Sequence, residues 1–175
     1  DRWAGFRQNS AVGATYSRQD GTGVEGSRYS MRVQRDSANA TTDFLELWGC
    51  PIITEDAIKL RGKKVTFSFW AKAGANYSAT SSALGFVVRT GTGTDEATVS
   101  TWTGSANVIN SSATLTTSWQ KFTATSDAVL GSGINQIGLQ FTFKPIGTAG
   151  ENDWFEVTQV QLCAGDVALP FMPKS

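Results

Sequence analysis

The chain has 175 residues, with 15 basic and 15 acidic side chains and no histidine. This length suits one domain, and a net charge of zero argues against nucleic acid or an anionic membrane surface as partners, since both attract basic proteins. Without histidine the chain lacks the commonest general base and zinc ligand, and a Ser-His-Asp triad is excluded.

Alternating apolar and polar residues predict a series of half-buried β-strands, in which every second side chain faces a core. In chain order the segments are 29–34, 44–47, 65–72, 84–89 and 137–143. Glycine-rich turn signals lie between them, at spacings typical of an antiparallel sandwich or barrel. The serine-rich stretches 78–82 and 110–118 are expected to be exposed loops or edge segments. No apolar run approaches the ~20 residues that cross a bilayer.

One short helix is predicted over 55–61, as a link between two strands. Thr54 is expected to cap it, and Glu55 and Asp56 favour its positive end. Gly62 is expected to end it.

The predicted binding site starts from Trp70. Within 65–72, Phe67 and Phe69 share the apolar parity and Trp70 falls on the opposite face. An outward indole on a strand can stack on a sugar ring, and it can equally be covered by a loop or a neighbouring subunit. Arg89 and Gln140 have outward parity in their own strands. If the three strands adjoin, Trp70, Arg89 and Gln140 converge on one open sheet face.

Two further aromatic residues, Trp102 and Tyr77, lie in polar contexts rich in glycine and serine. Exposed loop aromatics often bind ligands, so both are expected to bind a ligand or to contact another subunit. Trp48 is expected to close the rim of the site. Trp119 and Trp154 are expected to pack, whereas Trp3 and Phe6 are open between core, interface and rim.

Metal ligands and disulfides find little support in the sequence. Asp20, Glu25, Asp153 and Glu156 offer oxygen ligands, but no loop has the alternating acids of a calcium site, so no cofactor is expected. Cys50 and Cys163 are too few for a disulfide framework. They are expected to be buried thiols, with a bridge between them as the alternative.

Carboxylate pairs, which glycoside hydrolysis requires, are also considered. The candidates are Asp43 with Glu46, Glu55 with Asp56, Asp95 with Glu96, and Glu151 with Asp153 and Glu156. Side chains one or three positions apart on a strand face opposite sides. In loops such carboxylates usually form turns or aid solubility, so no spacing selects a pair for acid–base catalysis. The domain is therefore expected not to be an enzyme.

Several segments, spread over nearly the whole chain, resemble motifs of one known family. They are GSRYSMRV (26–33), LRGKKVTFSFWAKA (60–73), GTGTDE (91–96), TSWQKF (117–122), DWFEVTQVQL (153–162) and the opening DRW (1–3). In this order they resemble the carbohydrate-binding jelly-roll domains of bacteriophage tail fibres. Two positions depart from the family pattern. Cys163 stands where an acidic residue is usual, and Thr158-Gln159 stands where related modules carry paired aspartates near a structural calcium.

The resemblance implies an all-β fold, an antiparallel β-sandwich jelly roll like that of carbohydrate-binding modules. Residues 1–175 are then a single domain of a longer tail-fibre or tail protein, made in the bacterial cytoplasm and located in the virion tail. The implied function is non-enzymatic attachment to a host cell-surface glycan. The implied partners are other tail subunits, in a homotrimer, without nucleic acid or membrane insertion. The alternatives are a purely structural module of the fibre or baseplate, and an accessory sugar-binding module of a secreted glycoside hydrolase.

Overall fold

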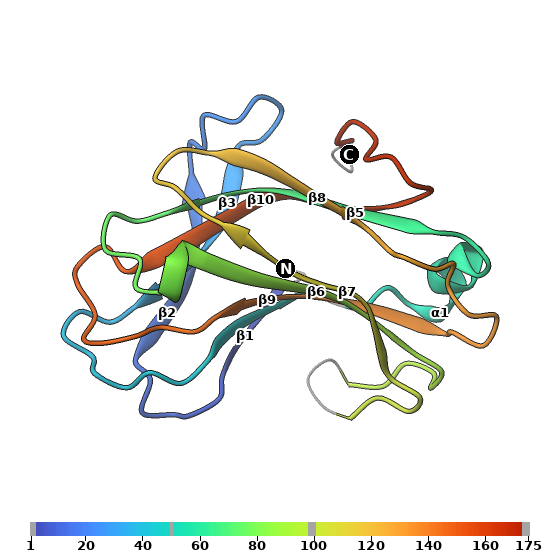
Figure 1. The fold of residues 1–175 in the computed structure, drawn as a ribbon, viewed down its shortest axis with the longest axis horizontal. Helices are drawn as coiled ribbons and strands as arrows, with labels where there is room; N and C mark the ends of the chain where they lie inside the picture. Colours follow the sequence, from blue (N-terminus) through green and yellow to red (C-terminus); the bar gives the residue numbers. More distant parts are fainter. Residues whose placement is uncertain (1–2, 50, 98–100, 173–175) are drawn as a thin grey trace.

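The computed structural model, which describes residues 3–49, 51–97 and 101–172, consists of two stacked five-stranded sheets (Figure 1). In spatial order, sheet A contains β1 (Trp3–Arg7), β4 (Leu45–Gly49), β9 (Gln136–Phe143), β6 (Ala83–Gly91) and β7 (Ala106–Thr114). Sheet B contains β2 (Ala14–Asp20), β3 (Tyr29–Arg35), β10 (Trp154–Ala164), β5 (Val65–Ala73) and β8 (Gln120–Thr125). All of these neighbours pair antiparallel. The predicted fold, an antiparallel β-sandwich jelly roll, is confirmed.

Aromatic rings from the two sheets meet at the centre of the sandwich. Phe67 and Phe69 of β5 are fully buried and lie against Phe86 of β6 and Phe141 of β9, with ring centroids 4.9 to 6.0 Å apart. Such tilted and edge-on pairs add about 0.5–1.5 kcal/mol each beyond the burial of their area. The predicted inward parity of these strands is therefore correct.

The short helix lies within one residue of the predicted range, and its second half is a 3₁₀-helix. α1 covers Thr54–Ala57 and continues into the 3₁₀-helix η1 (Ile58–Leu60), with Gly62 beyond it at φ +69°. Thr54 is not the cap, because the capping position is Ile53 and no side chain bonds there. No helix among the described residues is long and apolar enough to cross a membrane.

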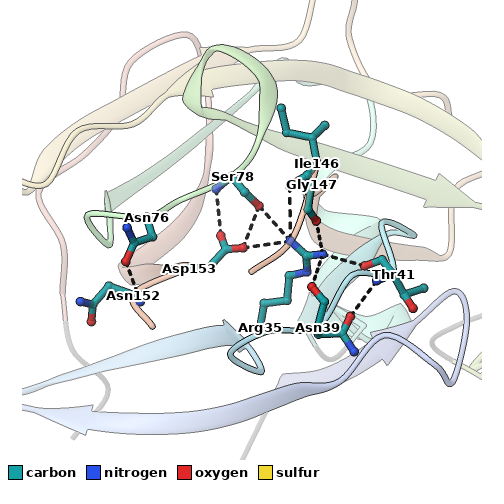
Figure 2. A network of polar contacts seen from close by, with 9 residues as sticks. All are labelled: Arg35, Asn39, Thr41, Asn76, Ser78, Ile146, Gly147, Asn152 and Asp153. Atoms are coloured by element: carbon teal, nitrogen blue, oxygen red, sulfur yellow. Dashed lines mark hydrogen bonds and ion pairs between the residues drawn. The ribbon is translucent and has the colours of Figure 1, made fainter. Parts of the chain in front are cut away.

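A fully buried arginine fastens the loops at the end of β3 (Figure 2). Arg35 forms a salt bridge with Asp153, which is also fully buried, at 3.1 Å from Nη1 to Oδ2. Its Nη2 donates to the backbone carbonyl oxygens of Asn39, Thr41 and Gly147, at 2.8, 3.0 and 2.7 Å. One guanidinium thus joins two separate loops to the start of β10.

Candidate functional site

A groove of about 540 Å³ lies on the outer face of sheet A. Leu47 and Phe141, which pair across β4 and β9, are fully buried in the core. Their neighbours Trp48 and Gln140 also pair, and side chains alternate along a strand, so these two face the opposite side. The described lining residues are Phe6, Glu46, Trp48, Arg89, Thr101, Ser105, Ala106, Asn107 and Gln140.

Trp48 forms the floor of the groove and supports Arg89. Its indole is 4% exposed, and its Nε1 donates to Oε2 of Glu46 at 2.7 Å. The guanidinium carbon of Arg89 lies 5.2 Å from the centroid of the indole, within range of a cation–π contact. Arg89 and Glu46 carry opposite charges, so the charged lining of the groove is balanced overall.

Unused polar groups face the groove. Arg89 donates from Nε to Oδ1 of Asn107 at 3.2 Å, and within the described part of the chain its two Nη atoms make no hydrogen bond. The side-chain amide of Gln140 likewise has no hydrogen-bond partner among the described residues. Phe6, 40% exposed, lies opposite Glu46 on edge strand β1. The groove thus offers planar donors, a planar acceptor and an aromatic surface to a ligand.

One wall of the groove is the loop between β6 and β7, of which 92–97 and 101–105 are described, and Trp102 anchors it. The indole of Trp102 lies so close to Gly138 that a Cβ there would be 2.8 Å from Cη2, and at Gly91 it would be 3.1 Å from Cε3. Nε1 of Trp102 donates to the carbonyl of Ala97 at 2.9 Å. At Gly138 the indole thus occupies the space of a side chain, whereas at Gly91 the nearest atom to a Cβ would be Nε2 of Gln136, at 2.9 Å.

The carboxylate of Glu96 holds the same loop together. It accepts bonds from Oγ1 and the backbone N–H of Thr103, at 2.7 and 2.9 Å, and from Nε2 of Gln136 at 2.6 Å. Hydrogen bonds from Thr103 are the main reason why the pKa of Glu96 lies below its ordinary value of 4.5. Since the ionised form is favoured in the folded loop, its stabilising effect is present above pH 4.5 and is lost as the pH falls through the lowered pKa.

We therefore expect the described parts of this loop, 92–97 and 101–105, to open in acid before the sandwich unfolds. Cleavage by pepsin within the loop should accelerate as the pH falls below 4.5, because protonated Glu96 binds Thr103 and Gln136 less strongly. Glu96→Gln is the control, since its cleavage should be insensitive to pH beyond the intrinsic profile of pepsin. Equal pH profiles for the two proteins would contradict the expectation.

The predicted convergence of Trp70 with Arg89 and Gln140 is wrong. β6 and β9 adjoin in sheet A and bring Arg89 and Gln140 to the same groove, but β5 belongs to sheet B. Trp70 has the predicted outward parity and is half-buried, with Lys121 and Thr158 as its partners in the neighbouring strands. Alternation determines which face of a strand is apolar, but it does not determine the sheet to which the strand belongs.

The prediction of exposed loop aromatics is wrong for Trp102 and Tyr77. Trp102 is 5% exposed beneath its own loop. The ring of Tyr77 packs 4.5 Å from that of Phe143, and its hydroxyl donates to the carbonyl of Ala83 at 3.0 Å. Burial raises the pKa of Tyr77 well above 10. In both cases the flanking residues are polar, but the aromatic side chain itself points toward the protein and is packed there.

Trp119 and Trp154, which were expected to pack, lie against cationic side chains. Nζ of Lys72 is 4.9 Å from the ring centroid of Trp119 and 5.5 Å from that of Trp154. The guanidinium carbon of Arg32 lies 4.1 Å from the ring of Trp154. Both indoles are half-buried, and their packing is therefore with charged side chains rather than with the phenylalanine core.

Two of the carboxylates considered as calcium ligands are engaged by cations of the chain. Asp153 is bound by Arg35. Glu156, 2% exposed, accepts a bond from Nε of Arg32 at 2.8 Å and lies 3.7 Å from Nζ of Lys72. Within residues 3–49, 51–97 and 101–172, no group of three or more His, Cys, Asp and Glu side chains is placed to hold a metal ion.

Of the two cysteines, the structure describes Cys163. Cys163 is a buried free thiol with Nε2 of Gln161 at 2.7 Å from its sulfur. Because Cys163 is free, the alternative of a bridge between Cys50 and Cys163 is wrong. Cys50 lies outside the described residues, so its burial stays a prediction.

Comparison with known proteins gives similarity of structure only, since no family model and no curated protein matches the sequence. The enzymatically active domain of tailspike protein 4 of bacteriophage CBA120 is similar with a TM-score of 0.62 and 13% identity, over 93% of this chain and 19% of that chain. A CBM4 module is similar with a TM-score of 0.55 and 17% identity, over 93% of this chain and 86% of its own.

A third similar structure is the family 11 carbohydrate-binding module of Clostridium thermocellum in complex with a β-1,3-1,4-mixed-linked tetrasaccharide. Its TM-score is 0.53 and its identity 14%, over 94% of this chain and 89% of that module. This chain thus spans most of each binding module but only 19% of the tailspike chain. At such identities the likeness establishes the fold, and the chain has the jelly-roll sandwich that carbohydrate-binding modules share.

Proposed function

We propose that this domain binds a neutral glycan in the groove on sheet A. The observation that carries the proposal is the meeting of Arg89, Gln140 and Asn107 beside Phe6, above the floor made by Trp48. Planar amide and guanidinium groups match pairs of sugar hydroxyls, and an aromatic ring matches the C–H face of a pyranose. The similarity to sugar-binding modules supports the same class of ligand.

Binding without hydrolysis is part of the proposal. Glu46 is the single carboxylate among the described residues that line the groove, whereas glycoside hydrolysis in most families uses two carboxyl groups facing each other. The carboxylate of Glu46 also accepts the indole N–H of Trp48, an arrangement that fixes the floor of the groove.

We place the domain in a phage tail fibre or a related appendage, where it attaches to a glycan of the host cell surface. The motifs at 60–73 and 153–162 and the similarity to a tailspike domain support this setting. Single sugar sites are weak, because hydroxyls lose bonds to water as they bind. A homotrimer within the virion tail, in contact with other tail subunits, would raise the avidity through effective concentration.

The test is a glycan array of bacterial surface polysaccharides, followed by calorimetry with the best hit. Arg89→Ala and Gln140→Ala should each raise Kd about tenfold, because each removes hydrogen bonds worth roughly 1–2 kcal/mol to a ligand. Lys121→Ala, on the exposed outer side of sheet B, is the matched control and should leave Kd unchanged. A hit that survives both groove variants contradicts the proposed site. Loss of binding on Trp70→Ala alone would move the site to sheet B.

A structural role in the appendage is the second candidate, and Trp70 favours it. A half-buried indole on the outer face of sheet B suits contact with a neighbouring subunit. An array without hits, together with light scattering that shows a trimer dispersed by Trp70→Ala, would support this role against glycan binding. If the domain does bind sugar, the alternative to a phage tail is that it is an accessory module of a secreted glycoside hydrolase.

A further inference from the structure

A second pocket, of about 600 Å³, shares no lining residue with the groove. Its walls come from both sheets and from the chain end, since Trp3 belongs to β1, Met31 to β3, Val157 to β10, and Phe171 to the C-terminal segment. The loop between β2 and β3 contributes Arg28. The pocket is therefore an independent site, with an apolar interior that the sheet A groove does not have.

Two arginines give this pocket its charge. The guanidinium carbons of Arg18 and Arg28 lie 4.4 and 5.1 Å from the ring centroid of Tyr29, which is 39% exposed. Neither arginine forms an ion pair with any described residue, and no aspartate or glutamate is among the described lining residues. By contrast, Arg32 and Arg35 are both paired with carboxylates. The pocket thus carries two arginines that have no ion-pair partner among the described residues. Asp20, which pairs with Tyr29 across β2 and β3, is an acidic side chain on the same strand as Arg18.

The backbone at the back of the pocket is held in an unusual conformation. Gln159 has φ +48° within an irregularity of β10, between Thr158 and Gln161. A residue other than glycine in this region is strained and persists where surrounding contacts determine its conformation. The side-chain amide of Gln159 donates to the carbonyl of Glu25 at 2.5 Å. This bond ties the loop that carries Arg28 to β10 and so holds the loop at the pocket.

We propose that this pocket binds an acidic sugar residue, meaning a pyranose that carries a carboxylate. Guanidinium groups are planar, always charged and suited to pairing with a carboxylate. The aromatic walls formed by Trp3, Tyr29 and Phe171 suit the apolar face of a sugar ring, which a bare inorganic anion would not use. The choice of a sugar rests on the proposed function, whereas the choice of an anion rests on Arg18 and Arg28 alone.

The experiment uses saturation-transfer NMR on the whole domain with glucuronate, galacturonate and N-acetylneuraminate, each beside its neutral methyl ester. At least one free acid should bind about tenfold more tightly than its ester. Arg18→Gln and Arg28→Gln should each abolish that preference. Lys121→Gln, which removes an exposed cation that lines neither the pocket nor the groove, should retain it. Both pocket arginines are exposed, so these variants should fold. Tyr29→Leu is a second test variant, because it removes one aromatic wall of the pocket without changing the charge.

Three results would overturn the inference. They are equal binding of acids and esters, binding of none of the three acids, and a preference that survives replacement of both arginines. Displacement of the acid by an equal concentration of inorganic phosphate would overturn the sugar as the body of the ligand. A blank array of neutral glycans together with acid binding through Arg18 and Arg28 would refute the groove and leave this pocket supported. The two proposals therefore fail separately.

Discussion

Arg35→Met should lower the free energy of unfolding by about 3–5 kcal/mol, the usual cost of removing one partner of a buried ion pair. Arg35 and Asp153 are both fully buried, so the variant leaves a carboxylate without its cation. Three backbone carbonyls lose their donor as well. For a domain of this size the melting temperature should fall by roughly 10 °C. Thermal and urea denaturation measure the change.

The comparison that isolates the buried charge is the double variant Arg35→Met with Asp153→Leu. It should recover part of the loss, because no unpaired charge stays in the interior. Lys59→Met, which breaks the exposed pair with Asp56 at 2.8 Å, is the surface control and should change little. A loss in Arg35→Met no larger than that in Lys59→Met would show that the buried cluster does not hold the loops.

Trp102→Ala should dismantle one wall of the groove without unfolding the sandwich. Removing a buried tryptophan costs about 3–5 kcal/mol, but Trp102 lies on the outer face of sheet A, over Gly138, rather than between the sheets. The loss should therefore appear as local opening of 92–105. Hydrogen exchange in that loop should accelerate strongly, while the core strand β5 keeps its protection. The glycan binding that we propose for the groove should be lost together with this wall.

Gly138→Ala approaches the same contact from the sheet. Its Cβ would lie 2.8 Å from Cη2 of Trp102, so the indole and its loop must shift. Gly85→Ala is a matched control, since β6 and β9 adjoin and its nearest contact, with Thr142, is at 3.4 Å. Fast exchange in Gly138→Ala and slow exchange in Gly85→Ala is the expected result. Equal exchange in the two variants, or unchanged protection in Trp102→Ala, would contradict the anchoring role.

The strands that alternation predicts are mostly those with a neighbour on each side. β5 and β9 lie inside their sheets, where one face is packed by phenylalanine and the sequence must alternate. β1 and β2, at the edges, bury little and carry no comparable pattern, so they escaped prediction. The serine-rich stretch predicted as loop or edge contains much of β7, an edge strand of largely exposed residues.

Part of the candidate groove could be predicted from the sequence, because strand parity placed the side chains of Arg89 and Gln140 on the outer face of their strands. The other part follows from the pairing of β4 with β9, which no local pattern reveals. The outward parity of Glu46 and Trp48 was nonetheless readable, because Leu45 and Leu47 alternate with them and are fully buried. Local sequence patterns could not predict the burial of Trp102. Its indole fills the space that a side chain at position 138 would occupy, and Gly138 leaves that space free.

Arg35 meets backbone oxygens in the way that a bound cation would, at the junction of loops from distant parts of the sequence. A charge that is covalently part of the chain cannot be diluted away or chelated. The bonds that Arg35 makes at this junction therefore do not depend on a dissociable metal ion, so a chelator should leave them intact.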